Sequence, residues 1–310
     1  MTIQTVYTHL RPGHIDDVVG TSVLAALLEA DVRFIHPQDP AIPAILANPQ
    51  AATVDVGGSY DPSRMHFDHH HDASLPCAAV LVLREVGPWE SSAAWTHMSI
   101  KDTLGPQEAA ARTREVSTDR DIRLERLVAC LVPCADLGKA WIRAGIMSQR
   151  FDTFGALVAW LHDHAGAERI DEAEKAHRMI RAKGLLAIES SRCTSVILPD
   201  GQRIRVVTPG GPHPIPAVEA FRKHGASIAI SPSDWPCEGS VWKMVRAESL
   251  HGRVDFSRLR GDADVSFAHN SGHLAVFRGD MPETIESIMA VIGRAWVGEV
   301  LLPESFLKSA

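Results

Sequence analysis

The order of apolar and polar positions in the first sixty residues is typical of a parallel sheet covered by helices. Residues 3–8 alternate and are rich in β-branched side chains, which predicts a strand. Residues 16–29 carry apolar side chains at helical spacing, with two acids in the predicted first turn. Residues 32–35 and 51–56 predict two further strands. We therefore expect an α/β fold, a parallel sheet with helices on both faces.

The pattern of apolar and polar positions changes after residue 75. The stretch from residue 76 to 165 is mostly helical in pattern, and a long helix is predicted over residues 172–190. Beyond residue 191, two alternating runs flank Pro199-Asp200-Gly201, which predicts a hairpin, and further short strands and two helices follow. The expected domains are residues 1–165, a helical linker over residues 166–191, and a smaller α+β domain over residues 192–310.

Composition narrows the class of protein. The 310 residues are 45% hydrophobic and 22% charged, so a sizeable core is available and disorder is excluded as the main state. A net charge of −7 argues against coating duplex DNA or an anionic membrane by bulk charge. The five cysteines are scattered without a CxxC motif, and no leader or membrane span is evident. We expect a cytoplasmic protein with reduced thiols.

Histidine is the unusual residue of this chain. Seven of the sixteen histidines precede residue 75 and stand among acids, unlike those of a polyhistidine tail. His9 and Asp55 each end a predicted parallel strand, and sites in such sheets lie at the carboxyl ends of the strands. The candidate ligands form four pieces: His9, His14 and Asp16 with Asp17; Asp55; Asp68, His69, His70 and His71; and Asp136.

Each piece alone has an ordinary structural explanation. His9 is then a strand-end histidine bonded to backbone, His14 and Asp16 are a helix cap and a first-turn acid, and Asp136 lies at a helix end. Together, their order along the chain favours a metal site. Imidazole and carboxylate ligands without thiolate suit Mn²⁺, Fe²⁺, Zn²⁺ or Co²⁺. Six or more converging ligands fit two metals about 3.5–4 Å apart that share a carboxylate, an arrangement that makes hydroxide available near neutral pH.

These residues resemble the DHH phosphoesterase superfamily and, more narrowly, the Myg-one family. Residues 8–17 are similar to that family's Thr-His-x-Gly-x-Phe-His-x-Asp-Glu opening, with Arg11, Gly13 and Asp17 as departures. Residues 54–62 match Val-Asp-Val-Gly-Gly-x-Tyr-Asp-Pro almost letter for letter. The Asp-His-His element is similar to residues 67–70, a later acid to Asp136-Leu137-Gly138, and a Phe-Val-His-x-Ser-Gly element to residues 267–272.

The resemblance implies a role for each matching residue in a catalytic domain that holds two metals. Asp55 would bridge both ions, and His71 has no matching position and is expected to be a loop residue. His70 would contact the substrate, and Asp68 would orient its neighbours. His9 and His14 would bind the first metal, and Asp16, His69 and Asp136 the second.

The resemblance also implies a substrate-binding segment in the second domain. His269, Asn270, Ser271, Gly272 and His273 follow a predicted strand, and their consecutive amides are expected to form an anion nest for a remote phosphate. The alternative is a simple hairpin turn. Arg178, Arg181 and Lys183 on the linker helix are either a solvated face or a contact for a nucleic-acid backbone.

The expected function is that of a metal-dependent phosphoesterase of the DHH type. The resemblance implies a 3′-to-5′ exonuclease on RNA or short oligonucleotides, with hydroxide between two divalent metal ions as nucleophile. Mn²⁺ is the first choice of ion, with Zn²⁺, Co²⁺ and Fe²⁺ open. The alternatives are hydrolysis of pyrophosphate, a cyclic dinucleotide or an amide, and a non-catalytic metal- or nucleotide-binding protein. No membrane partner is expected, and a homodimer stays open.

Overall fold

The computed structural model divides the chain into two compact units, Met1–Met179 and Ile180–Ala310. The division falls inside the long helix α9 (Ala167–Ser190). No helix among the described residues has the length and apolar character needed to cross a bilayer. The structure describes residues 2–9, 13–37, 39–72, 74–87, 89, 91–233, 241–269 and 271–298.

Unit 1 is built on a five-stranded sheet in the order β2-β1-β3-β5-β4. Strand β1 pairs in parallel with β2 and β3, β3 pairs in parallel with β5, and the short β4 is antiparallel at the edge. The carboxyl ends of four strands therefore meet at one edge of the sheet, as the α/β prediction requires. The strands are β1 (Thr5–His9), β2 (Asp31–Ile35), β3 (Ala51–Val54), β4 (Tyr60–Asp61) and β5 (His66–Phe67).

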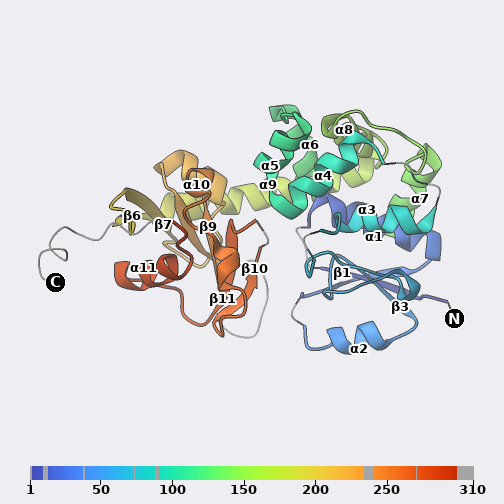
Figure 1. Ribbon diagram of the computed structural model, residues 1–310. Coiled ribbons are helices and arrows are strands. Elements are labelled where there is room, and N and C mark those ends of the chain that lie inside the picture. The colour runs from blue at the N-terminus through green and yellow to red at the C-terminus, as the bar shows by residue number, and fades with distance from the viewer. Residues whose placement is uncertain are drawn as a thin grey trace, which may run out of the picture. The chain divides into compact units, whose positions relative to one another are not determined.

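Helices cover both faces of this sheet (Figure 1): α1 and α3 lie on one side and α2 on the other. Helix α1 is buried from Ile15 to Ala26, because α3, α7 and the sheet surround it. At Gly138 of α7 a Cβ atom would lie 1.9 Å from the backbone oxygen of Ser22, so the two helices approach as closely as only glycine permits. The first helices are α1 (Ile15–Leu28), α2 (Ile42–Ala47) and α3 (Ala78–Val86).

The remaining helices of unit 1 form a layer over the core. Thr118 caps α6 by a reciprocal pair of hydrogen bonds with Asp121, and the Thr153 hydroxyl accepts from the Ala156 amide at the start of α8. The buried aromatic rings of Trp95, Trp141 and Phe154 fill the space between these helices and α1. The helices of this layer are α4 (Ala93–Leu104), α5 (Pro106–Thr113), α6 (Asp119–Ala129), α7 (Ala135–Ala144) and α8 (Phe154–Asp163).

Unit 2 contains a six-stranded mixed sheet in the order β10-β11-β9-β8-β7-β6. The predicted hairpin is confirmed as the β6–β7 pair, and only β7–β8 runs parallel among the described pairs. Trp242 and Phe277 stack at 4.1 Å between ring centres in its core. Its elements are β6 (Arg192–Ile197), β7 (Arg203–Thr208), α10 (Ala217–His224), β8 (Ile228–Pro232), β9 (Val241–Arg246), β10 (Val265–Ala268), β11 (Leu274–Arg278) and α11 (Ile285–Arg294).

Candidate metal centre

Three parallel strands deliver polar side chains to the same edge of the unit 1 sheet. His9 is the last residue of β1, Asp55 follows β3, and Asp68 follows β5. The registers Thr8 to Val54 and Val54 to Phe67 place these strand ends side by side. Strands β3 and β5 are buried along their whole length, and the polar residues of the group begin where the chain leaves the sheet.

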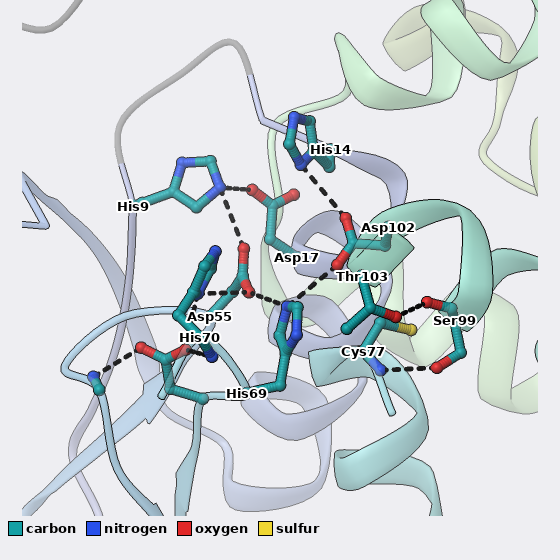
Figure 2. Close-up of polar contacts among 12 residues, drawn as sticks. His9, His14, Asp17, Asp55, His69, His70, Cys77, Ser99, Asp102 and Thr103 are labelled. Carbon is teal, nitrogen blue, oxygen red and sulfur yellow. Dashed lines mark hydrogen bonds and ion pairs between the residues drawn. The ribbon is translucent and has the colours of Figure 1, made fainter. Parts of the chain in front are cut away.

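Asp55 occupies the centre of the group. Its backbone has φ 59°, a left-handed conformation that is uncommon for a residue other than glycine and is tolerated by aspartate. Its amide donates to the carbonyl of Phe67 at 2.9 Å, which fixes it to β5. Its two carboxylate oxygens lie 3.2 Å from His9 Nε2 and 3.2 Å from His69 Nε2. Figure 2 shows this carboxylate between the two rings.

The first turn of α1 adds two acids. Asp17 places Oδ2 2.6 Å from His9 Nε2. Asp16 is completely buried, and neither of its oxygens accepts a hydrogen bond from any described residue. A buried carboxylate without donors is costly, so this position requires a cation or a proton.

Helix α4 supplies a carboxylate that the sequence interpretation did not include. Asp102 Oδ2 lies 3.0 Å from His69 Nε2, and its Oδ1 lies 3.4 Å from His14 Nδ1 (Figure 2). The His69 nitrogen therefore faces both Asp55 and Asp102. The amide of Cys77 donates to Ser99 Oγ at 2.9 Å, which joins the start of α3 to α4.

His70 is held by the acid that begins the Asp-His-His sequence. Its Nδ1 donates to Asp68 Oδ1 at 2.7 Å, and its backbone amide donates to the same oxygen at 2.9 Å. The other oxygen of Asp68 accepts from the amide of Gly58 at 2.6 Å. Asp68 is thus fully engaged in orienting the turn, whereas the neighbouring His71 is exposed.

The histidines of the group keep their protons to a higher pH than a free imidazole does. Burial lowers the pKa of His69, but Asp102 and Asp55 outweigh it and raise this pKa to about 12. For His9 burial again opposes, and Asp17 and Asp55 raise the pKa well above 6.5. The contact with Asp102 raises the pKa of His14 to about 9. The carboxylates therefore favour the protonated, cationic form of each imidazole ring that faces them.

The carboxylates divide into two kinds. Burial works to raise the pKa of Asp55 and Asp102, but the facing histidines hold both pKa values well below the usual range. Asp16 behaves oppositely, because burial and the charges of Asp102, Asp55 and Asp17 raise its pKa well above 3.8. Burial and the same negative field raise the pKa of the Cys77 thiol, which disfavours a thiolate there.

The donor set fits divalent cations. Three groups among the described residues have ligand atoms within 4.8 Å of one another, and Asp55 belongs to two of them. Oxygen and imidazole donors of this kind suit Mn²⁺, Zn²⁺, Co²⁺ or Fe²⁺. The groups are Asp55, His69 and His70; His9, Asp17 and Asp55; and His14, Asp16 and Asp102.

Asp136 does not join these groups, which corrects the predicted ligand set. Its side chain is 76% exposed, and its Oδ1 lies 4.0 Å from Lys139 Nζ. The reason is the packing of α7, which directs Leu137, Gly138 and Trp141 inward and leaves residue 136 on the outer side. Arg11 lies outside the described residues.

Two acids of the group were missed or undervalued in the sequence. Asp17 was included in the first piece of candidate ligands as a first-turn acid, but it was given no metal to bind. Asp102 has no motif around it, but it recurs at helical spacing from the buried residues Trp95, Met98 and Ser99. The signal that could have identified Asp102 is its position as an acid on the apolar face of a predicted helix.

The predicted substrate-binding segment of unit 2 is a tight turn between β10 and β11. Ser271 Oγ lies 2.9 Å from His269 Nδ1 and 2.6 Å from His273 Nδ1. The buried Arg246 donates from Nε to the Gly272 carbonyl and from Nη2 to the Ser271 carbonyl, both at 3.2 Å. Asn270 lies outside the described residues.

The expected anion nest is not present in the described part of this turn. The amide of Ser271 donates to His269 Nδ1 at 3.1 Å, and the amide of Gly272 donates to the His269 carbonyl at 2.9 Å. Both amides are used within the turn, so they do not face outward as a nest requires. The side chains of His269, Ser271 and His273 remain the candidate contacts.

Comparison with known families agrees with the motifs at the amino-terminal end. Residues 5–75 match the family model MYG1_exonuc, described as an uncharacterised protein family (UPF0160). The resemblance to the Myg-one family is confirmed over these residues. The Myg-one match includes β1, the first turn of α1, Asp55 and the Asp-His-His turn. No curated protein matches the chain.

Several solved structures are distantly similar to the whole chain. The pGpG-specific phosphodiesterase PggH of Vibrio cholerae is 16% identical, with a TM-score of 0.41, and the match covers 95% of this chain and 99% of that one. RecJ of Thermus thermophilus in complex with Mn²⁺ is 16% identical, with a TM-score of 0.46; the match covers 98% of this chain and 55% of that one. The DHH domain of a member of the s1p family of ribosomal proteins is 11% identical, with a TM-score of 0.36 and 94% and 85% coverage.

Proposed function

We propose that this protein hydrolyses phosphoester bonds with the help of two divalent cations. The observation that carries the proposal is the convergence of three buried carboxylates with two histidines, in which Asp16 has no hydrogen-bond donor among the described residues. A structural role for these acids would provide donors for every buried oxygen. A cation satisfies them instead, and it also lets an anionic substrate approach a protein of net charge −7.

The residues define where the two cations would be held. One position lies around His9 and Asp55, and the other around His69, Asp55 and Asp102, with Asp16 beside Asp102. Bound cations at such positions supply Lewis-acid activation of water and stabilisation of negative charge on a phosphoryl group. Asp102 takes the role that the motif assigned to Asp136.

His70 and Asp68 would contact and orient the substrate, as the resemblance implies. Asp68 fixes the Nδ1 edge of the His70 ring by hydrogen bonds to both the ring and the backbone. The ring is 35% exposed, so it is accessible to a phosphate oxygen while its orientation is fixed. In this arrangement the pKa of His70 is raised by Asp55 and Asp68 against the effect of burial, which favours an imidazolium beside an anion.

Within this function we propose RNA or short oligonucleotides as substrates, degraded in the 3′-to-5′ direction with Mn²⁺. The name of the matching family model supports an exonuclease. The His269–His273 turn, with two imidazoles around one hydroxyl, supplies groups suited to a remote phosphate. A chain with this net charge favours short or single-stranded substrates over a duplex.

The test begins with protein stripped of metal by chelation. We expect no turnover until Mn²⁺ is added, and then release of mononucleotides from the 3′ end of a 5′-labelled RNA of about five to ten nucleotides, a length of about one binding site. Pyrophosphate, a cyclic dinucleotide and an amide substrate are assayed beside it. Full turnover after exhaustive chelation overturns the metal-dependent proposal, and preference for one of the other substrates overturns the exonuclease.

The pair Asp102→Asn and Asp136→Asn separates the structural from the motif-based ligand set. We expect Asp102→Asn to lower turnover by at least about 100-fold, because loss of a group that holds a metal exceeds the roughly 10–100-fold effect of its hydrogen-bond partners. Asp136→Asn changes an exposed side chain outside the group and is the matched control. Loss of activity in the Asp136 variant alone would restore the motif-based assignment.

A further inference from the structure

Asp17 has a position in the site that neither the motif nor the family match explains. It is buried, its Oδ2 lies 2.6 Å from His9 Nε2, and its Oδ1 accepts no hydrogen bond from a described residue. The shortest contact between a histidine and an acid in this group is therefore made by an acid to which the motif gives no ligand role. Oδ2 is paired with His9, but the buried Oδ1 is left without a donor, and a cation beside the pair would satisfy it.

His14, which the motif offers as the partner of His9, is placed differently. Its side chain is 68% exposed, and its Nδ1 lies 3.4 Å from Asp102. The rings of His9 and His14 meet edge to face at 6.1 Å between centres. The ligand atoms of His14 group with Asp16 and Asp102, not with His9 and Asp55. His14 is thus separated from the first cation position.

Gly13 explains how Asp17 reaches His9. A Cβ atom at residue 13 would lie 2.3 Å from Asp17 Oδ2 and 2.6 Å from Oδ1, far inside contact distance. Gly13 is not among the described glycines with positive φ, so its backbone does not itself require glycine. Any side chain at residue 13 would occupy the space in which the Asp17 carboxylate lies.

The two departures from the motif are therefore connected. Gly13 stands where the motif has phenylalanine, and Asp17 stands where it has glutamate. An aromatic ring at residue 13 would fill the space that the Asp17 carboxylate occupies. The missing side chain and the shorter acid together bring a carboxylate to His9.

We propose that Asp17, in place of His14, completes the first cation position with His9 and Asp55, and that Gly13 is a positioning residue that keeps its carboxylate there. The inference rests on the proposed metal-dependent function. The position then has two carboxylates and one imidazole. Such an oxygen-rich set suits Mn²⁺ or Mg²⁺ better than a set with two imidazoles, which suits Zn²⁺.

The test measures metal binding directly, without activity. Full-length protein is stripped with chelator and titrated with Mn²⁺, and bound ions are counted by elemental analysis and calorimetry. We expect two ions for the wild type, one for Asp17→Asn, and two for His14→Asn. We expect the affinity for the weaker-bound ion to fall at least about tenfold in Gly13→Ala, although this variant removes no ligand atom.

A double variant shows whether Gly13 acts through Asp17. If the added methyl group displaces the carboxylate, Gly13→Ala has no further effect on Mn²⁺ binding once Asp17 is asparagine. The control is Gly211→Ala, since a Cβ there has nothing within 4 Å and its φ is not positive. This control binds two ions with wild-type affinity. Additive losses in the double variant would show that Gly13 acts independently of Asp17.

The outcomes separate this inference from the function on which it rests. A wild-type protein that binds no divalent ion overturns the proposed function itself. A wild type with two ions, of which His14→Asn loses one and Asp17→Asn none, overturns the inference alone. Circular dichroism checks the folding of each variant. Should Asp17→Asn fail to fold, Gly13→Ala keeps the test decisive, because unchanged affinity in that variant contradicts the proposal.

Discussion

The two polar centres of this protein differ in how their hydrogen bonds are satisfied. At the sheet edge of unit 1, buried acids crowd around histidines, and Asp16 has no donor among the described residues. In the turn of unit 2, His269, Ser271 and His273 bond to one another, and Arg246 holds the carbonyls of the turn. In the first centre a buried carboxylate is left without a donor, whereas in the second the described histidines and Ser271 are paired within the turn.

This contrast assigns different chemistry to the two regions. A group of acids that is unstable alone binds cations strongly, because the cation removes their mutual repulsion and their unmet hydrogen bonds together. A turn whose groups are already paired must exchange those bonds for bonds to a ligand, and the net gain is small. We therefore expect variants in unit 1 to affect chemistry and metal content, and variants in the turn to affect substrate affinity.

The largest effect is expected for Asp55→Asn. Asp55 contacts both His9 and His69, so the variant weakens both cation positions at once. We expect turnover to fall by roughly 10³-fold or more, because bound metals contribute several kcal/mol to the barrier and each ~1.36 kcal/mol is tenfold in rate. Steady-state kinetics and elemental analysis measure the two losses. Wild-type metal content in this variant would contradict the bridging role, and retained nucleotide binding without any wild-type turnover would indicate a binding protein.

Asp16→Asn should have opposite effects on the metal-free and metal-loaded protein. The raised pKa of Asp16 means that the native state holds a proton more strongly than the unfolded chain above pH 3.8, so metal-free stability falls as pH rises through this window. Asparagine removes that dependence and the buried charge. We expect the metal-free Tm at pH 7 to rise by about 2–4 °C for each kcal/mol recovered.

The same variant should respond less to Mn²⁺. The wild type gains stability from ligand binding in proportion to the logarithm of concentration over Kd, and loss of a carboxylate raises Kd. We expect about a 10–100-fold weaker Kd for one ion, seen as a smaller Mn²⁺-induced rise in Tm. A metal-free Tm below that of the wild type would show that Asp16 is satisfied by a partner and would weaken the contrast.

In the turn of unit 2, His273→Ala is expected to act on affinity. A contact with a remote phosphate is made equally in the ground and transition states, so KM rises about tenfold while kcat changes less than about threefold. The control is the exposed His213 of the same unit, changed to alanine. If kcat falls as far as kcat/KM, then His273 takes part in the chemical step and the division between the two regions is wrong.

The sequence was sufficient where the site depends on strand ends. His9 and Asp55 each end a predicted strand, and the parallel β1–β3 pairing brings them to one edge. Asp68 was found by its motif, because the two-residue β5 before it has no strand pattern. Asp102 was not predictable in this way, because its place depends on how α4 packs in the helical layer with α5 and α8, and no local motif marks it. Asp136 failed for the opposite reason. Its motif was recognisable, but the close approach of Gly138 to Ser22 decides which side of α7 faces inward.

The smallest effect is expected for His66→Gln, which tests a buried histidine three residues from His69. Burial lowers the pKa of His66, and its ring bridges Thr53 Oγ1 and the carbonyl of Leu46, both at 3.1 Å. Below pH 6.5 the unfolded chain binds a proton that native His66 does not, so stability is lost as pH falls from 6.5 toward the lowered pKa. Glutamine retains a donor for the Leu46 carbonyl and removes the titration.

We expect His66→Gln to cost about 1 kcal/mol at pH 7.5, the value of one hydrogen bond, and we expect the deficit in Tm relative to the wild type to shrink between pH 7 and pH 5. Variant and wild type are compared as metal-free protein, because the raised pKa values of His9, His69 and Asp16 add an opposite pH dependence that is the same in both and cancels in the difference. His97→Gln serves as a comparison, since burial lowers the pKa of His97 as well. An unchanged slope in the His66 variant would mean that this ring is protonated in the native state, and that positive charge at the sheet edge extends beyond the histidines that face carboxylates.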